Sequence, residues 1–267
     1  MKTILSYVLT PVYMFVFGML LLIFHPIQMV TRYIWGYPVR KVAVDIMNYG
    51  LLYSLWILGT RITYKGLEKI PPNRPLIIVA NHQSTLDIPA VIIGFRKHHP
   101  KFISKIELGQ GIPRISYNLR HGGSVLIDRK NKSQSVKDIL MLGKHIEKNN
   151  YAACIFAEGT RTKTGLVNTF QPAGIASLIR TAPSAIIVPF AIDGHYQLMK
   201  NRNFPMTFGV HLIYTVLDPI EPKGMDTTVL AQMIEDGIRK ELGQLGEEKR
   251  STLILAYPDP SGSTLDN

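Results

Sequence analysis

The N-terminus carries the feature that most constrains how this chain can fold. Residues 3–31 form an apolar stretch that contains no Asp, Glu, Lys or Arg. About 20 consecutive apolar residues are enough to cross the hydrocarbon core of a bilayer. Lys2 followed by an apolar run is also compatible with a secretory signal peptide, but this run is longer and lacks a small-residue cleavage site. We therefore expect a retained, membrane-associated helix.

A second apolar segment follows at residues 42–59 and is interrupted only by Asp45. Its aromatic residues Tyr49, Tyr53 and Trp56 suit a membrane interface, although an ordinary helix packed on a soluble domain would also tolerate them. The basic residues between the two segments favour a cytoplasmic or headgroup location for the connection: Arg32, Arg40 and Lys41. We expect residues 1–60 to form membrane-anchoring helices that span the bilayer, re-enter it or lie within one leaflet.

From residue 61 onward, short β-branched runs alternate with helix-like stretches. This alternation predicts an α/β domain at residues 61–250, with a mixed, largely parallel sheet flanked by helices. The predicted strands cover residues 61–65, 76–80, 101–104, 124–127, 152–156, 185–191 and 210–216. Pro189 lies inside one of them, and proline in a sheet is expected only at an edge or a bulge. Residues 251–267 have the composition of a flexible tail.

The charge of the chain predicts an anionic partner. Lys and Arg number 30 against 19 Asp and Glu, which gives a net charge of +11 and suits lipid headgroups, nucleic acid or a phosphorylated substrate. Many basic residues lie at positions 96–137, where most of them are expected only to steer anions. Lys105 and Arg129 differ because each ends or follows a strand. The single Cys154 excludes an intramolecular disulfide and favours a reducing compartment.

The strongest candidate for chemistry follows the strand at residues 76–80. His82 and Asp87 are five residues apart, so they would not lie side by side on one regular helix. They can meet if His82 lies in the loop and Asp87 in the first helical turn, with Ser84 or Thr85 as the N-cap. A carboxylate on one imidazole nitrogen leaves the other free to accept a proton, which makes a general base. Taken alone, the pair also fits a loop histidine beside a first-turn acid.

A second polar cluster follows the strand at residues 152–156. Glu158, Gly159, Thr160 and Arg161 place an acid, a flexible backbone and a fixed cation at the same edge of the predicted sheet. The guanidinium can bind a phosphate and the carboxylate can orient a hydroxyl or another arginine. A surface turn with a local ion pair would have the same composition.

Together these residues resemble the 1-acylglycerol-3-phosphate acyltransferase family of glycerolipid acyltransferases. The resemblance spans about residues 66–215 and rests on four blocks in the order of that family: NHQSTLD at 81–87, GGSVLIDR at 122–129, FAEGTRT at 156–162, and Val188 with Pro189. Two departures stand out. Ala157 replaces a usual proline, and residues 114–116 replace an aromatic-rich stretch, which leaves substrate identity less constrained than reaction type.

The resemblance implies an acyl transfer from acyl-CoA or acyl carrier protein to the sn-2 hydroxyl of 1-acylglycerol 3-phosphate, giving phosphatidic acid. It implies His82 as the general base, Asp87 as its orienting acid, and a membrane location with the catalytic domain on the cytoplasmic face. It further implies a substrate-binding set of Lys105, Arg129, Glu158, Gly159, Thr160 and Arg161. No cofactor is expected beyond the acyl donor.

Three other functions are compatible with parts of the sequence. The acceptor can be a different lysophospholipid or a lyso-aminolipid. The chain can instead be a non-catalytic basic module that binds membranes. A hydrolase would use water as the acceptor, but no G-x-S-x-G turn is present. We expect no metal, because the histidines have no ligand spacing, and no nucleic-acid partner, because no recognition helix or stacking aromatics are evident.

Overall fold

The computed structural model describes residues 1–105, 122–128, 131–201 and 203–246. Within these ranges a seven-stranded sheet has the order β1-β7-β6-β2-β5-β3-β4, and every neighbouring pair is parallel except β6 and β7. The predicted mixed, largely parallel sheet is therefore confirmed. The expected tail at residues 251–267 lies outside the described residues.

The strands agree closely with the predicted positions. They are β1 (Arg61–Lys65), β2 (Leu76–Ala80), β3 (Lys101–Lys105), β4 (Val125–Ile127), β5 (Ala152–Phe156), β6 (Ile186–Asp193) and β7 (His211–Val216). The helices of the α/β part are α2 (Asp87–Gly94), α4 (Lys132–Asn149), α5 (Pro172–Thr181), α6 (His195–Leu198) and α7 (Thr227–Glu241), with short 3₁₀ turns at η2 (Leu67–Lys69) and η3 (Arg96–His98).

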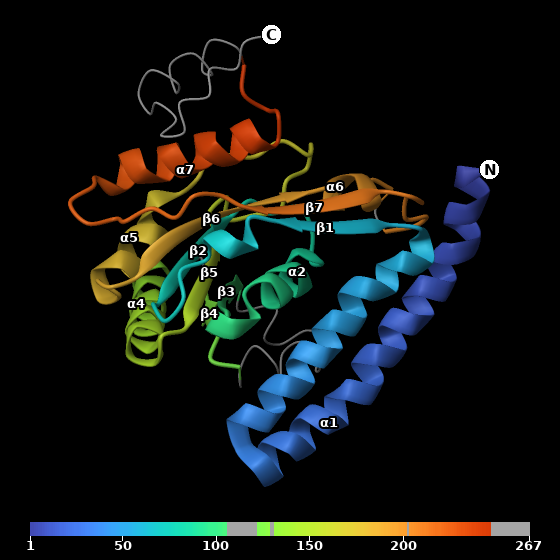
Figure 1. Cartoon of the computed structure of the whole chain (residues 1–267), viewed down its shortest axis with the longest axis horizontal. Helices are drawn as coiled ribbons and strands as arrows, with labels where there is room; N and C mark the ends of the chain where they lie inside the picture. Colours follow the sequence, from blue (N-terminus) through green and yellow to red (C-terminus); the bar gives the residue numbers. More distant parts are fainter. Residues whose placement is uncertain (106–121, 129–130, 202, 247–267) are drawn as a thin grey trace.

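Helices cover both faces of the sheet (Figure 1). Alternate residues of β2 point to opposite faces, so Ile78 packs with Ala90 and Val91 of α2, whereas Ile77 packs with residues of α4, α5 and α7. All five residues of β2 are buried. A strand covered on both sides reads as a continuous apolar run, which explains why the β2 sequence LIIVA shows no alternation.

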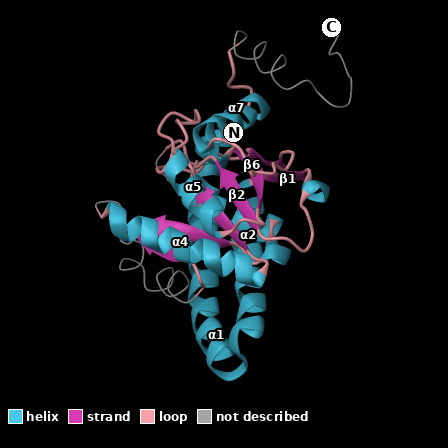
Figure 2. Cartoon of the chain, turned by 90° about the vertical axis from the view of Figure 1, so that its left-hand side faces the viewer, coloured by secondary structure: helices cyan, strands magenta, loops and turns pink. Residues whose placement is uncertain are grey.

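The N-terminal segment folds into a helical hairpin. The helix α1 (Lys2–Tyr53) is broken at Gly36, where φ is 74° and the backbone leaves the helical region, and it continues into the 3₁₀ turn η1 (Ser54–Leu58). The two arms run along one side of the α/β unit, and Figure 2 shows them as a pair extending beyond it. The second arm and η1 contribute Leu52, Leu55 and Leu58 to the core beneath the sheet.

Hydrogen bonds also join the first arm of the hairpin to the segment between β6 and β7. The hydroxyl of Thr10 accepts from the backbone N–H of Met206 at 2.9 Å, and the hydroxyl of Ser6 accepts from Phe208 at 3.0 Å. Both hydroxyls also donate to carbonyls one helical turn earlier in α1. These bonds fix the first arm relative to the segment between β6 and β7.

Pro189 lies in an interior strand, at a place where its missing N–H costs no ladder bond. β6 pairs with β7 only at residues 190–193, where Phe190 lies opposite Val216, the last residue of β7. Beyond Val216 the chain bulges, and Ile220 then pairs with Ile187 of β6. The carbonyl of Pro189 still accepts from Leu217 at 3.0 Å. The expectation that proline marks an edge or a bulge is confirmed for the bulge.

Candidate active site

The candidate site lies where β2, β5 and β6 end, because parallel strands bring their carboxyl ends to one edge of the sheet. The loop after β2 carries His82, the loop after β5 carries Glu158, and α6 follows β6. The side chain of Asn81 joins two of these strand ends: it donates to the carbonyl of Ile192 at 2.9 Å and accepts from its N–H at 2.8 Å.

The predicted pairing of His82 with Asp87 is present. Nδ1 of His82 lies 2.7 Å from Oδ2 of Asp87, which is the first residue of α2. The same oxygen accepts the backbone N–H groups of Gln83 (2.7 Å) and Ser84 (2.9 Å), so the loop wraps around the carboxylate. His82 and Asp87, which are five positions apart and would not lie side by side on a regular helix, meet here because the segment between them forms a turn.

The capping of α2 differs from the expectation. Leu86, rather than Ser84 or Thr85, occupies the N-cap position, and it contributes no side-chain hydrogen bond. The hydroxyl of Ser84 instead accepts from the N–H of Leu86 at 3.0 Å. The Asp87 carboxylate accepts the N–H groups of Gln83 and Ser84, which precede the helix, so it shapes the loop and does not cap α2.

Asp87 is fully buried, yet its environment keeps it charged. Burial alone raises the pKa of this carboxyl, but hydrogen bonds from His195 and His82 outweigh it and hold the pKa well below its usual range. A carboxylate only accepts hydrogen bonds, so Nδ1 of His82 carries the proton. Nε2 of His82 is then left with a lone pair.

The imidazole of His82 is held in orientation from a second direction. Its ring stacks on Phe156, the last residue of β5, with ring centroids 4.0 Å apart and planes 14° apart. The side chain remains 18% exposed, in contrast to the 0% exposure of Asp87. Within the described part of the chain, Nε2 has no hydrogen-bond partner, so its lone pair is available to accept a proton.

Glu158 contacts the protein itself through both oxygens. Oε1 accepts the backbone N–H of His82 at 2.7 Å, and Oε2 accepts the N–H (2.9 Å) and the side-chain amide (2.6 Å) of Asn168. Burial raises the pKa of Glu158, while these hydrogen bonds act in the opposite direction. In this arrangement the carboxylate joins the His82 loop to the loop after β5.

Gly159, Thr160 and Arg161 follow β5 and lie next to the His82 loop at the edge of the sheet. Gly159 has φ of +69°, which favours glycine, and a Cβ added there would meet no described atom within 4 Å. Thr160 and Arg161 are exposed, and the next residue, Thr162, donates its N–H to the carbonyl of His82 at 2.9 Å. The backbone thus holds the Arg161 segment against the His82 loop.

The remaining predicted residues are only partly described. The backbone of Lys105 forms the end of β3 opposite Ile127, whereas Arg129 and residues 114–116 lie outside the described residues. Sequence reasoning missed His195, whose Nδ1 lies 2.5 Å from Oδ1 of Asp87. The rule that pointed to His82 would have found it, because His195 follows the carboxyl end of β6 at the same edge of the sheet.

A cavity of about 390 Å³ opens between the hairpin, α2 and β3. Thr85, Leu86 and Ser104 line it beside the carboxyl ends of the strands, and mainly apolar side chains of α1 and α2 line its walls. Polar groups gather where the second arm of the hairpin begins. There Lys101 donates to the hydroxyl of Tyr37 at 2.8 Å, and burial lowers the pKa of Lys101 to about 8. The volume is within the range of small-molecule sites.

Comparison with known proteins places this geometry in context. A family model described as Acyltransferase matches residues 61–193. The chain is 29% identical over 201 residues to the probable 1-acyl-sn-glycerol-3-phosphate acyltransferase of Mycoplasma genitalium, covering 68% of this chain and 72% of the relative. It is 22% identical over 210 residues to 1-acyl-sn-glycerol-3-phosphate acyltransferase alpha of Ovis aries, covering 78% and 71%.

One solved structure shares the fold. The crystal structure of the 1-acyl-sn-glycerophosphate (LPA) acyltransferase PlsC from Thermotoga maritima superposes with a TM-score of 0.69 and 22% sequence identity. The match covers 92% of this chain and all of the other. Because it extends well beyond residues 61–193, most of the N-terminal hairpin belongs to the shared fold as well.

Proposed function

Because this chain belongs to the acyltransferase family, we propose that it transfers a fatty acyl group to the sn-2 hydroxyl of 1-acylglycerol 3-phosphate, giving phosphatidic acid. The donor is acyl-CoA or acyl carrier protein. The observation that carries the proposal is the 2.7 Å contact between His82 and Asp87, which leaves Nε2 of an otherwise buried imidazole facing the open edge of the sheet.

In the proposed reaction Nε2 of His82 removes the proton from the acceptor hydroxyl. The oxygen then attacks the thioester carbonyl, the carbon–sulfur bond breaks, and the departing thiolate takes the proton back from the imidazolium. The carboxylate of Asp87 stabilises that imidazolium and keeps its ring oriented. No acyl-enzyme, metal or cofactor takes part, and residues 61–250 form the catalytic domain.

Four described residues of the proposed substrate-binding set follow β5 at the edge of the sheet where His82 lies: Glu158, Gly159, Thr160 and Arg161. Arg161 faces the acceptor phosphate, with Lys105 and Arg129 contributing further positive charge. Gly159 leaves space beside it, since a Cβ added there would meet no described atom within 4 Å, while Glu158 keeps the two loops together. The apolar cavity beside Leu86 accommodates the acyl chain.

The proposal is tested by identifying the product. The purified protein in detergent, incubated with acyl-CoA and a panel of lysolipids, is expected to form phosphatidic acid from 1-acylglycerol 3-phosphate faster than any other diacyl lipid, as measured by mass spectrometry. A faster reaction with another lysophospholipid or a lyso-aminolipid would identify that lipid as the acceptor and leave the proposed acyl transfer unchanged. No product with any acceptor would favour a non-catalytic membrane-binding module.

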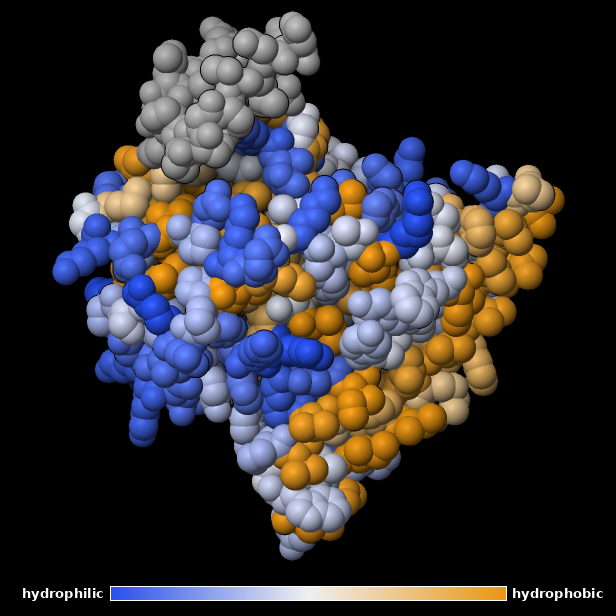
Figure 3. All heavy atoms as spheres, in the orientation of Figure 1, coloured by the Kyte–Doolittle hydropathy of each residue, from blue (hydrophilic) through white to orange (hydrophobic). Residues whose placement is uncertain are grey.

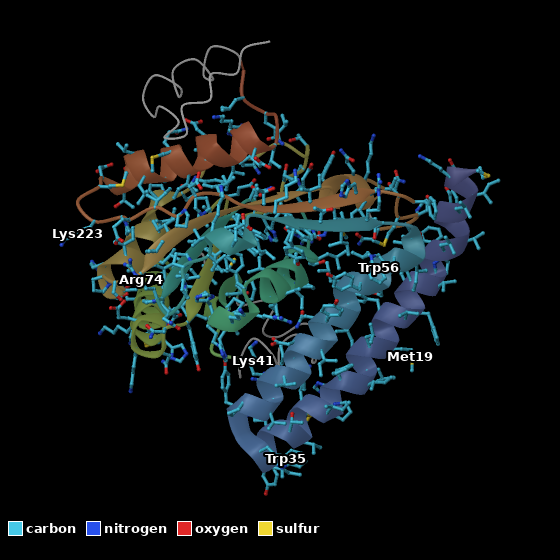
Figure 4. The ribbon with its side chains drawn as sticks, viewed as in Figure 1. Met19, Trp35, Lys41, Trp56, Arg74 and Lys223 are labelled. Carbon is cyan, nitrogen blue, oxygen red and sulfur yellow. The ribbon has the colours of Figure 1, made fainter. Side chains whose placement is uncertain are left out.

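We further propose that residues 1–60 anchor the protein in one leaflet, with the catalytic domain on the cytoplasmic face. The hairpin is long and apolar enough to cross a membrane by length and composition. Apolar side chains cover the outer arm of the hairpin, which is the arm that precedes Gly36, whereas polar side chains dominate the other side of the molecule (Figure 3). Met19 and Trp35 lie on the hairpin, and Arg74 and Lys223 lie on the opposite side (Figure 4).

The position of the hairpin tip favours one leaflet over a full crossing. Tyr37 follows the break at Gly36, and its hydroxyl contacts Lys101 (2.8 Å) and Nδ1 of His99 (2.9 Å) on the α/β unit. A hairpin that crossed the bilayer would place about 30 Å of hydrocarbon between its tip and that unit. The tip therefore stays on the same side as the catalytic domain.

Charges on the outer arm are expected to release the protein from membranes. Val8 and Phe15 are 60% and 69% exposed, and replacing both with Asp removes two apolar groups from lipid and inserts two charges. We expect partitioning onto liposomes to fall by about 10²-fold or more in a flotation assay. The matched double variant Val136→Asp and Met141→Asp, on exposed positions of α4, should leave partitioning unchanged. Equal release by both variants would contradict the proposed anchor.

A further inference from the structure

A second histidine reaches the carboxylate of Asp87 from the side opposite His82. His195 begins α6 and is completely buried, with its Nδ1 at 2.5 Å from Oδ1 of Asp87. His82 and the two loop N–H groups bind the other oxygen, Oδ2. The carboxylate therefore lies between two imidazoles, only one of which is accessible to a substrate.

The far side of His195 is occupied as well. Its Nε2 lies 2.8 Å from the hydroxyl of Tyr214, a completely buried residue of β7. Burial raises the pKa of Tyr214 well above its usual value, so the phenol keeps its proton. Because the carboxylate only accepts, Nδ1 of His195 carries hydrogen, and in the neutral ring Nε2 accepts from Tyr214. The hydrogen bonds then run in one direction, from Tyr214 through His195 to Asp87.

Without His195, Oδ1 of the buried Asp87 carboxylate would have no short hydrogen bond from a described residue. The only other described partner of Oδ1 is the hydroxyl of Ser84 at 3.4 Å, whereas Oδ2 has three partners within 2.9 Å. A buried charge that loses its hydrogen bond either takes up a proton or moves. Either change would disturb the orientation of His82, which depends on the same carboxylate.

We propose that His195 is a positioning residue, a neutral buried imidazole that, held by Tyr214, fixes the Asp87 carboxylate and through it the tautomer and orientation of His82. This inference rests on the proposed function, because it requires His82 to act as the base. His195 and Tyr214 both lie outside residues 61–193, the part matched by the family model, so the family assignment does not imply them. His195 donates and accepts hydrogen bonds, and no proton passes through it.

Few other titratable groups surround this chain of contacts. Among the described residues, the further groups that interact electrostatically with Asp87 or Tyr214 are phenols and one thiol, Tyr13, Tyr53, Tyr64 and Cys154, and the carboxyl of Glu158 interacts with His82. None of them supplies a charge that could replace the contact between His195 and Asp87.

The first test compares two substitutions of different chemistry. Asn places an amide nitrogen where Nδ1 of histidine lies, so His195→Asn keeps a donor for Asp87, whereas His195→Leu removes it. We expect His195→Leu to lower kcat by about 100-fold with KM for the acceptor nearly unchanged, and His195→Asn to stay within about 10-fold of the wild type. His98→Leu, at another buried histidine bound to the carbonyl of Pro71, is the matched control.

The pH profile gives a readout that a purely structural role would not move. If Asp87 takes up a proton or moves when it loses His195, its negative charge stabilises the His82 imidazolium less, so the acid limb of kcat in His195→Leu should shift to lower pH. His195→Asn and His98→Leu should keep the wild-type limb. A His195→Leu enzyme with wild-type kcat and an unshifted limb would overturn the proposal.

A spectroscopic test does not depend on activity or on the stability of the Leu variant. In the full-length protein with ¹⁵N-labelled histidine, the resonances assigned to His195 should be those of a neutral ring protonated at Nδ1, and Tyr214→Phe should perturb them. A protonated ring, or the Nε2–H tautomer, would contradict the inference. If His82→Ala retains activity, the proposed function fails; if His82→Ala is inactive while His195 variants are normal, only this inference fails.

Discussion

Replacing His82 with Ala is expected to lower kcat/KM by at least about 10³-fold. The substitution removes the only group in the described site that is oriented by a buried carboxylate and still has a free nitrogen at the edge of the sheet. General-base catalysis by a positioned side chain typically contributes 10² to 10⁴, and the lost imidazole also fixed the geometry of attack. Steady-state rates with acyl-CoA and 1-acylglycerol 3-phosphate in detergent measure the change.

The fold should survive this substitution. The ring of His82 is partly exposed, and its backbone contacts with Glu158 and Thr162 do not involve the side chain. We therefore expect the melting temperature and liposome binding to stay close to wild type. His211→Ala, which removes an exposed histidine bound to Thr63, is the matched control and should retain full activity. Near-normal activity of His82→Ala would exclude this residue as the base.

Asp87→Asn is expected to lower kcat by about 10³ to 10⁴ while preserving the size of the side chain. The amide presents a donor towards groups that are themselves donors: the imidazoles of His82 and His195 and the N–H groups of the loop. His82 then places its proton on Nε2, the tautomer that cannot accept a proton from the substrate. Asp218→Asn, at an exposed carboxylate bound to Lys69, should change little.

The same variant should change how stability depends on pH. The pKa of Asp87 is depressed in the folded protein, so its charge contributes stability above the pKa of the unfolded chain, about 3.9, and this contribution is lost as the pH falls towards the folded value. Denaturant unfolding should show wild type more stable than Asp87→Asn at pH 7. The difference should shrink below about pH 4, and a constant difference would contradict the assignment.

Most secondary structure was predictable because its signals are local. The apolar run at residues 76–80 and the alternating pattern of strands and helices give the correct strands, with boundaries that coincide or differ by at most two residues. Pro189 was expected at an edge or a bulge from its missing N–H alone, and it lies at a bulge. The order of the strands was not predictable from such signals, because it depends on which distant segments pair.

The candidate site was predictable only in part. His82 and Asp87 lie close together in sequence, directly after a strand. The rule that ligands bind beyond the carboxyl ends of strands was enough to identify them as candidates. Glu158 was expected to bind substrate, but its two oxygens contact His82 and Asn168 across two loops. Whether it also contacts an acceptor stays a prediction. One of these partners, His82, lies 76 residues away in sequence, and such a contact leaves no local pattern.

The sequence by itself determined the class of fold, the apolar character of the N-terminal segment and the pairing of one imidazole with one carboxylate, because periodicity, charge and short spacing suffice for each. Only the tertiary structure decided that the N-terminal segment turns back at Gly36, and that His195 and Tyr214 complete the surroundings of Asp87. Asp87, His195 and Tyr214 lie on three separate elements. Their contacts exist because buried polar groups need hydrogen-bond partners: Nδ1 of His195 binds Oδ1 of Asp87, and Nε2 of His195 binds the hydroxyl of Tyr214.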